Sequence, residues 1–335
     1  MSSQGTIRII RAAVAALLVV PFTSGFAQSV PNVAVREKEI AITIDDLPLN
    51  GPEIGIKRLR RMTGKILAAF TRAHAPVVGF VNESLLYVPG ETDDRIEVLR
   101  SWTTAGFELG NHSYSHVRFA DVSLSAYEDD FVKGETVTEH LMKTRGQKPK
   151  YFRHPYLKMG ATAALERSFE NFIAERGYRI APVTVDSMDW MFLAAFRQAR
   201  DRGRGRGQAA GERRISQAYL DYFSARITAV ESVSNDLFGH GITQILLLHA
   251  NELNAEALDR LLSILVQRGY RFVTLEQALQ DPVFRFPDRY RDTSDWLIHW
   301  AFSLGKQIKS PAPPAFIQTA YAAAQKPAVK PARKH

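Results

Sequence analysis

The sequence contains no cysteine, so neither a disulfide framework nor a thiolate-ligated metal site can form. It also lacks the glycine patterns G-x-G-x-x-G and G-x-x-x-x-G-K-[ST], which argues against a nucleotide cofactor. No apolar run reaches the roughly 20 residues that a helix needs to span a bilayer. With 335 residues, 45% of them hydrophobic, the chain can still bury a full core without covalent cross-links.

The first residues have the layout of a secretory signal. Arg8 and Arg11 precede an apolar run from Ala12 to Phe22, and small residues lead up to a cleavage site after Ala27. We therefore expect residues 1–27 to be a signal peptide and the mature protein to be exported, to the periplasm or outside the cell. An uncleaved anchor is the alternative; after cleavage no stable membrane span is expected.

The positive charge is concentrated in two segments of the mature chain. The whole sequence carries +8, of which the signal contributes +2, residues 201–214 contribute +3 and residues 326–335 contribute +4. The remaining body is therefore close to neutral, and nucleic acid is not expected as a partner. We interpret both basic segments as solvated, with adhesion to an anionic wall or membrane surface as the alternative.

Short β-like runs alternate with amphipathic helix-like stretches such as residues 56–73 and 255–268. Several runs are almost continuously apolar, as expected for strands that are buried on both faces. This alternation predicts an α/β fold with a parallel sheet, best described as a distorted (β/α)7-type barrel, with an open doubly wound sheet as the alternative. The seven runs are Glu39–Asp45, Pro76–Val81, Phe107–Gly110, Tyr151–Arg153, Tyr178–Val185, Gln244–His249 and Arg271–Thr274.

The predicted domain spans residues 28–283 and is interrupted by a basic Gly/Arg surface insertion at 201–214, followed by a helix over 215–234. Residues 284–309, which contain Trp296 and Trp300, are expected to form a C-terminal helical extension. The proline- and alanine-rich residues 310–335 are expected to be a disordered basic tail.

Two of the strand-end motifs suggest a metal site. Asp45 and Asp46 end an apolar strand, so one carboxylate can bind a metal while the other takes a proton. His112 and His116 are spaced i, i+4, which places both imidazoles on one face of a helical turn. Asp46 with these two histidines would leave coordination positions open, as catalytic zinc requires. Alone, the aspartate pair is also compatible with an ordinary strand-to-turn exit, and the histidine pair with a chance spacing or a cap.

Three further motifs follow other predicted strands. Arg153 can hold a carboxylate ionised, Asp189 beside Trp190 can orient a histidine next to an aromatic wall, and His249 has the near-neutral pKa of a general acid. In isolation each is more simply a surface turn, a capped loop or a core histidine. Because all five motifs lie at the carboxyl ends of strands, we expect them to meet on one rim of the barrel.

In order, the motifs T-x-D-D, H-[ST]-x-x-H, R-x-P-[YF], D-x-x-D-W and L-x-H resemble those of the polysaccharide deacetylase family, also called NodB-homology or carbohydrate esterase family 4. Their set covers about Ile40 to Ala278. His154 departs from the family pattern, in which proline is frequent at that position. The motifs are Thr43–Asp46, His112–His116, Arg153–Tyr156, Asp186–Trp190 and Leu247–His249.

The resemblance implies a role for each matching residue. Asp45 would be the general base, with Arg153 holding it, and His249 the general acid, with Asp189 tuning it. Asp46, His112 and His116 would bind one divalent metal ion. The backbone N–H of Tyr156 would help to stabilise the oxyanion, and Trp190 and Leu247 would line the pocket for the acetyl methyl group.

Zinc is the expected metal, and cobalt, nickel or manganese would also suit two histidines and an aspartate. The expected substrate is an N-acetylated polysaccharide such as peptidoglycan, a chitin-like polymer or an exported glycan. An O-acetyl esterase acting on acetylxylan or a similar polymer, and a glycan-binding protein without catalysis, are the alternatives. Non-haem iron oxygenases share the ligand set but have no need of Asp45 and His249.

Overall fold

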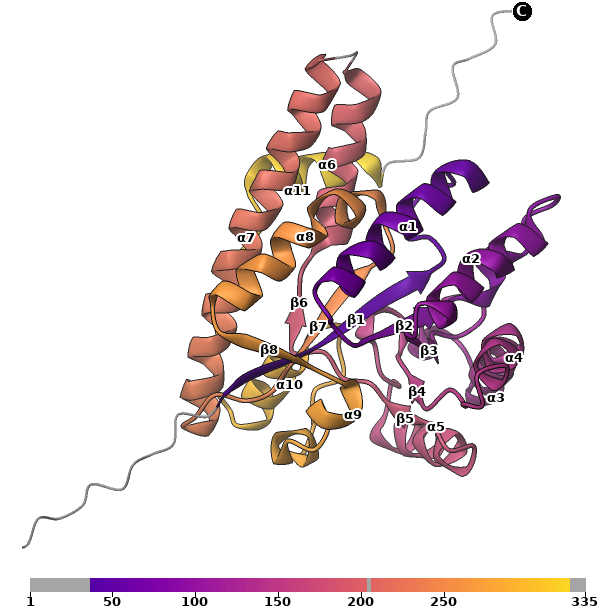
Figure 1. Cartoon of the computed structure of the whole chain (residues 1–335). Helices are drawn as coiled ribbons and strands as arrows, with labels where there is room; N and C mark the ends of the chain where they lie inside the picture. The colour runs from indigo at the N-terminus through magenta and orange to yellow at the C-terminus, as the bar shows by residue number, and fades with distance from the viewer. Residues whose placement is uncertain (1–36, 204–205, 326–335) are drawn as a thin grey trace, which may run out of the picture. The chain divides into compact units, whose positions relative to one another are not determined.

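The computed structural model describes residues 37–203 and 206–325 of the chain. The signal peptide predicted for residues 1–27, and residues 326–335 of the predicted tail, lie outside this part (Figure 1). Within the described residues, no helix combines the length and the apolar character needed to cross a membrane.

The described residues form one sheet in which every strand pair is parallel. The strand order is β5-β4-β3-β2-β1-β7-β6, and β8 pairs with the beginning of β1 outside this path. The strands are β1 (Lys38–Leu47), β2 (Val77–Val81), β3 (Glu108–Asn111), β4 (Tyr151–Phe152), β5 (Arg179–Ile180), β6 (Val185–Asp186), β7 (Gln244–His249) and β8 (Tyr270–Val273).

The two end strands of this path, β5 and β6, are joined by residues 181–184 alone. Because so short a connection cannot cross a flat sheet, the sheet must curl until its ends approach one another. The predicted distorted (β/α) barrel is therefore confirmed, with two differences. The fifth predicted run, Tyr178–Val185, is divided between β5 and β6, and the seventh, Arg271–Thr274, supplies β8 outside the curled path.

Successive side chains of a strand point to opposite faces of the sheet, so the strands contribute to two separate hydrophobic cores. On β1, Ile40, Ile42 and Ile44 belong to the large core beneath the surrounding helices, whereas Ala41 packs with Val78 and other residues inside the curled sheet. Helix α1 (Ile56–Arg72) shows the matching pattern, since its buried residues recur at the three- and four-residue spacing of one helix face.

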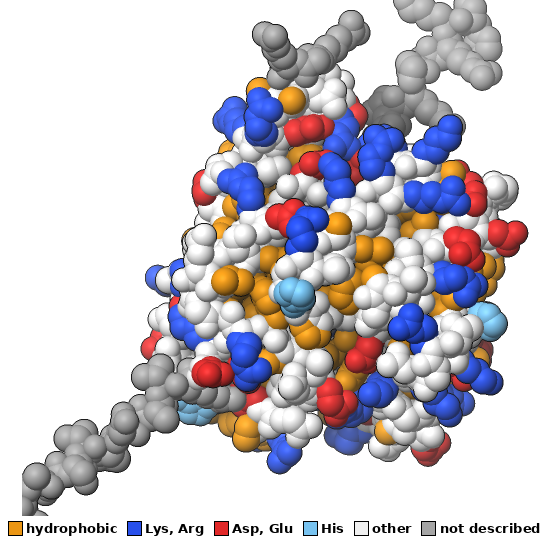
Figure 2. All heavy atoms as spheres, in the orientation of Figure 1, with side chains coloured by type: hydrophobic (Ala, Val, Ile, Leu, Met, Phe, Trp, Pro, Cys, Tyr) orange, Lys and Arg blue, Asp and Glu red, His pale blue; other side chains and the backbone are white. Residues whose placement is uncertain are grey.

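The helices cover the outside of the curled sheet (Figure 1). Figure 2 shows basic and acidic side chains interspersed on one face of the molecule. Basic residues of α1 pair with acidic residues of α8 (Glu252–Gln267); Arg72, for example, forms an ion pair of 2.7 Å with Asp259. The helices are α1 (Ile56–Arg72), α2 (Thr92–Thr104), α3 (Leu124–Lys133), α4 (Thr136–Lys143), α5 (Ala163–Glu175), α6 (Asp189–Arg202), α7 (Arg206–Phe238), α8 (Glu252–Gln267), α9 (Leu275–Ala278), α10 (Trp296–Ser303) and α11 (Ala315–Ala324).

The segment predicted as a Gly/Arg surface insertion at 201–214 is instead mostly helical. Helix α6 continues to Arg202, and α7 begins at Arg206 and includes the predicted helix over 215–234. Arg200 and Glu212 join the two helices through an ion pair of 2.6 Å. A Cβ at Gly211 would lie 3.1 Å from the Cβ of Ala199, so the small residues allow the helices to pack closely.

The C-terminal residues also differ from the prediction. Helix α10 lies within the predicted helical extension, and its Trp296 and Trp300 are buried. The expectation of disorder over 310–335 is wrong for residues 315–324, which form α11 after Pro314. Proline cannot continue a helix from its interior but is tolerated before the first turn, and Ile317 is completely buried against the main core.

Candidate active site

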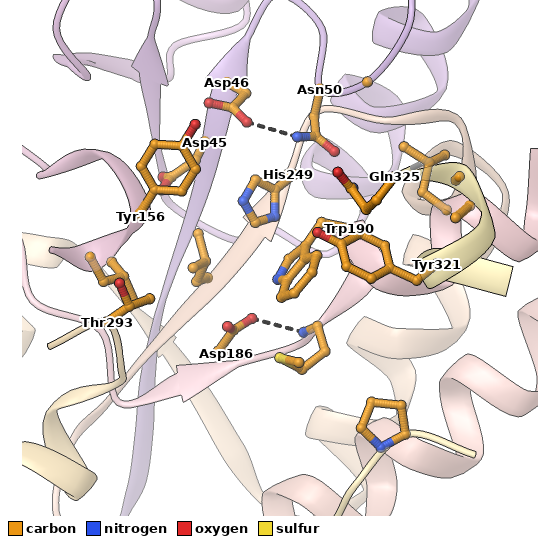
Figure 3. A pocket seen from close by; sticks show the side chains of 18 of the residues that line it. Asp45, Asp46, Asn50, Tyr156, Asp186, Trp190, His249, Thr293, Tyr321 and Gln325 are labelled. Atoms are coloured by element: carbon orange, nitrogen blue, oxygen red, sulfur yellow. Dashed lines mark hydrogen bonds between the residues drawn. The ribbon is translucent and has the colours of Figure 1, made fainter. Parts of the chain in front are cut away.

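The carboxyl ends of the strands surround a cavity of about 1080 Å³ (Figure 3). The register of β1 and β7 places Asp45 opposite His249, because parallel strands end at the same edge of the sheet. Arg153 and Asp189 lie fully buried behind this lining. The structure thus brings all ten predicted site residues together; the eight that line the cavity are Asp45, Asp46, His112, His116, Tyr156, Trp190, Leu247 and His249.

Asp46, His112 and His116 form the group that could hold a metal ion. Their ligand atoms lie within 4.8 Å of one another, and Asp46 Oδ1 is 3.6 Å from His112 Nε2 and 3.4 Å from His116 Nε2. Asp46 Oδ1 is buried and has no hydrogen-bond partner among the described residues, whereas Oδ2 accepts a bond of 2.7 Å from Asn50 Nδ2. An unsatisfied carboxylate oxygen between two imidazole nitrogens fits a divalent cation.

The tautomer of His112 follows from its hydrogen bond. Its Nδ1 lies 2.8 Å from the backbone oxygen of Arg153, and because a carbonyl only accepts, Nδ1 must carry the proton. Nε2 therefore presents its lone pair to Asp46. Burial, reinforced by neighbouring His116, lowers the pKa of His112 to about 3, so the ring is the neutral form that binds metals.

Arg153 holds Asp45. Its Nη1 donates to Asp45 Oδ1 over 2.8 Å and to Thr43 Oγ1 over 2.6 Å, and its Nε donates to the backbone oxygen of Ala181. Burial raises the pKa of Asp45, and the charge of Arg153 opposes this rise. Asp45 Oδ2 remains on the side of His112, 3.6 Å from its Nε2, and is the oxygen available to take a proton.

Asp189 holds His249 on the other side of the cavity. Its Oδ1 lies 2.8 Å from His249 Nδ1, and its Oδ2 accepts bonds from the His249 backbone N–H and from Asn251 and Asn254. Burial alone lowers the pKa of His249, but the charge and hydrogen bond of Asp189 outweigh it and raise the pKa to about 10. His249 is therefore protonated at neutral pH, and its ring lies in the cavity near Asp46 (Figure 3).

Several site residues have left-handed backbone conformations. Asp46, His116, Tyr156 and Met188 have φ values of 59°, 56°, 59° and 57°. Such values are unfavourable for residues other than glycine and persist only where the surroundings enforce them. Asp46 lies near the end of β1, Tyr156 follows β4 and Met188 follows β6. His116 follows β3 in an irregular turn, not in the helical turn expected from its spacing to His112. The unfavourable backbone conformations thus occur at residues that line the cavity.

The sequence reasoning missed several residues that support the site. It did not assign Asn50, which binds Asp46, or the asparagines Asn251 and Asn254 at the start of α8. The cap is Asn251, whose side chain accepts from the Asn254 backbone N–H, and both Asn side chains donate to Asp189. The asparagine two residues after His249 was a signal for a cap, but only the folded structure places it beside Asp189.

His154, the departure from the family pattern, does not face the cavity. Its Nδ1 lies 2.8 Å from the hydroxyl of Tyr127, and its ring stacks with Tyr127 and Phe119 in a buried aromatic cluster. Burial lowers the pKa of His154 to about 3. We therefore assign it to packing behind Arg153 and Tyr156.

Comparison with known proteins gives a family match over residues 32–171, described as polysaccharide deacetylase. This match includes Asp45, Asp46, His112, His116, Arg153 and Tyr156 and ends before Asp189 and His249. A peptidoglycan-N-acetylglucosamine deacetylase from Bacillus cereus is 22% identical over 252 residues, which cover 73% of this chain and 70% of the relative.

Two solved structures are also similar to the chain. Peptidoglycan deacetylase PdaC from Bacillus subtilis is 23% identical, with a TM-score of 0.46 over 74% of this chain and 93% of that one. A family 4 carbohydrate esterase pseudoenzyme from Bacillus anthracis is 17% identical, with a TM-score of 0.46 over 72% of this chain and 66% of that one.

Proposed function

Because the chain belongs to the polysaccharide deacetylase family, we propose that it is a metal-dependent hydrolase that removes N-acetyl groups from GlcNAc or MurNAc units of a polysaccharide. One observation carries the proposal. The metal-ligand group of Asp46, His112 and His116 lies in the same cavity as a carboxylate held by a buried arginine and a histidine held by a buried aspartate.

The first proton transfer belongs to Asp45. A divalent ion held by Asp46, His112 and His116 would polarise the acetyl carbonyl and make water nucleophilic near neutral pH. Asp45 takes the proton of the attacking water through Oδ2, while Arg153 keeps Oδ1 in place. The buried position that raises the pKa of Asp45 also makes its carboxylate a stronger base.

The second proton transfer belongs to His249. When the carbon–nitrogen bond of the amide breaks, the departing nitrogen needs a proton, which His249 donates from Nε2. Asp189 binds the opposite nitrogen, Nδ1, and stabilises the protonated ring before the transfer. The products are acetate and the free amine of the sugar, and Asp45 and His249 then exchange protons with water to restore the starting state.

The remaining residues would position the acetyl group. The backbone N–H of Tyr156 would donate to the oxygen that becomes negative, which requires a donor fixed before the reaction. The left-handed conformation of Tyr156 supports such a fixed donor. Trp190 and Leu247 line the same cavity and provide apolar surface for the methyl group.

The location of the reaction is also part of the proposal. The signal-like residues 1–27 support export to the periplasm or the cell exterior, where peptidoglycan, chitin-like polymers and exported glycans would be available. The B. cereus relative is named for peptidoglycan N-acetylglucosamine, which supports GlcNAc in peptidoglycan as the first substrate to test.

The test is acetate release from peptidoglycan, chitin oligomers and acetylated xylan, measured on the purified chain with its metal content determined in the same preparation. We expect release from the N-acetylated glycans, its loss after chelation, and its return with zinc. Faster release from acetylxylan would favour an O-acetyl esterase. Binding of glycans without release of acetate from any of them, with metal bound, would show a pseudoenzyme.

A further inference from the structure

Two segments that follow the family match pack on one another beside the active site. They are the hairpin of α6 and α7 and the C-terminal residues 293–325. Arg226 of α7 is almost completely buried, forms an ion pair with Asp295 and donates to Ser310 Oγ over 2.7 Å. Gln198 of α6 donates over 3.1 Å to the backbone oxygen of Ala320. These contacts fix the C-terminal segment along the hairpin.

The C-terminal segment forms part of the wall of the active-site cavity. Ser310, Pro311, Tyr321 and Gln325 line it together with the metal-ligand group. The rings of Tyr321 and Trp190 meet edge to face with centroids 5.0 Å apart. Figure 3 shows Tyr321 beside Trp190, with Gln325 extending on the side of Asn50. Helix α11 therefore borders the end of the cavity that contains Trp190.

The walls of the cavity limit what it can hold. Its volume of about 1080 Å³ lies slightly above the range of about 300–1,000 Å³ typical of pockets for small molecules. An interior unit of a polymer needs exits on both sides of the reacting sugar. At the Trp190 end, Tyr321 and Gln325 form part of the wall of the cavity.

We infer that α11 closes this end of the cavity, so that the enzyme deacetylates the sugar unit at or next to a glycan chain end. Interior units would be spared. This inference rests on the proposed deacetylase function and specifies its substrate as short N-acetylated saccharides and the ends of longer chains. Tyr321 and Gln325 would be specificity-determining residues, and Ile317, the one buried side chain of α11, would dock the helix.

The test uses a pentamer of N-acetylglucosamine and locates each lost acetyl group by fragment-ion mass spectrometry. In the full-length wild type we expect loss at a terminal or subterminal unit. Ile317→Asp, which places a charge in the docking site of α11, should raise the ratio of interior to terminal deacetylation by about tenfold or more, as removal of a discriminating contact does. Tyr321→Ala should raise it less. Thr319→Ala, on the exposed side of the same helix, is the matched control and should not change it.

Equal rates at interior and terminal units in the wild type would overturn the inference. So would an unchanged ratio in Ile317→Asp when hydrogen exchange shows that residues 315–324 have become unprotected. If Ile317→Asp does not fold, the double variant Tyr321→Ala/Gln325→Ala decides in its place. No acetate from any substrate in the metal-loaded wild type would overturn the proposed function and this inference with it, whereas release without end preference overturns the inference alone.

Discussion

Two histidines that line the cavity, the buried His112 and the partly exposed His249, have opposite protonation states although carboxylates lie near both. His112 donates Nδ1–H to the backbone oxygen of Arg153, and burial lowers its pKa to about 3. His249 binds Asp189 instead, and its pKa is raised to about 10 in spite of burial. The partner of Nδ1 thus decides whether a histidine is a neutral ligand or a protonated acid.

The largest effect on activity is expected when a residue of the metal-ligand group is replaced. Asp46→Asn removes the charged ligand between the two imidazoles and should lower both metal content and kcat, the latter by about 10³-fold or more, because several kcal/mol of transition-state stabilisation come from the ion. Metal analysis and acetate release measure the two effects. Asp94→Asn, an exposed change on α2 that also removes one negative charge, is the control. Full metal occupancy in Asp46→Asn would contradict the assignment.

Replacing the proposed general acid, His249, should leave the metal bound. His249→Ala is expected to lower kcat by about 10²–10⁴-fold on an N-acetyl substrate, the usual contribution of a general acid. The loss should be much smaller on an aryl acetate, because its leaving group departs without a proton. Equal losses on amide and ester would show that His249 has another role. His140→Ala, on the exposed side of α4, serves as the control.

How much of this difference between the two histidines the sequence predicts depends on the structural element concerned. The apolar runs of β1 and β7 and the polar residues that end them were sufficient to predict the rim, because parallel strands share one carboxyl edge. Of the two hydrogen-bond partners of Nδ1, only that of His249 was predictable. Asp189 was assigned to His249 from the motif, but the bond from His112 to the Arg153 backbone depends on how two strand ends turn in space.

The two misassigned segments, residues 201–214 and 315–324, have packing partners that lie far away in the sequence. The glycines of 201–214 suggest a loop, and the prolines of 310–314 suggest that the disorder extends through the residues that follow. In the fold, Gly211 allows α7 to approach Ala199, and Ile317 of α11 is buried by residues far away in the sequence. Tertiary packing thus outweighs local propensity at 201–214, whereas residues 310–314 are not helical and the alanine-rich α11 follows them in agreement with its propensity. The position of α11 in the wall of the cavity depends on packing and could not be predicted from local sequence.

The smallest effect, and the sharpest test of the comparison, is expected from Asp189→Asn. The substitution keeps the shape of the side chain but removes the charge that raises the pKa of His249. His249 must be protonated to act, so activity falls as pH rises through its pKa. In the variant this pKa moves down, because the charge of Asp189 is lost while burial, which lowers the pKa, remains. The alkaline limb of kcat/KM should therefore shift to lower pH. We expect a loss of about 10–100-fold at pH 9 and a smaller one at pH 6.

The same linkage predicts stability. Because the folded pKa of His249 lies above its ordinary value of 6.5, the pair with Asp189 stabilises the wild type fully below about 6.5 and loses this contribution as pH rises towards 10. The carboxylate of Asp46 also raises the pKa of His249, and a cation bound to Asp46 would offset this effect. In the metal-loaded enzyme, the alkaline limb of kcat/KM should therefore lie below pH 10.

For Asp189→Asn, Ser187→Ala is the matched control, because it removes a hydrogen bond of 3.2 Å to Asp189 but leaves the charge of Asp189 in place. If Ser187→Ala shifts the alkaline limb as far as Asp189→Asn does, hydrogen bonding rather than charge sets the protonation state of His249.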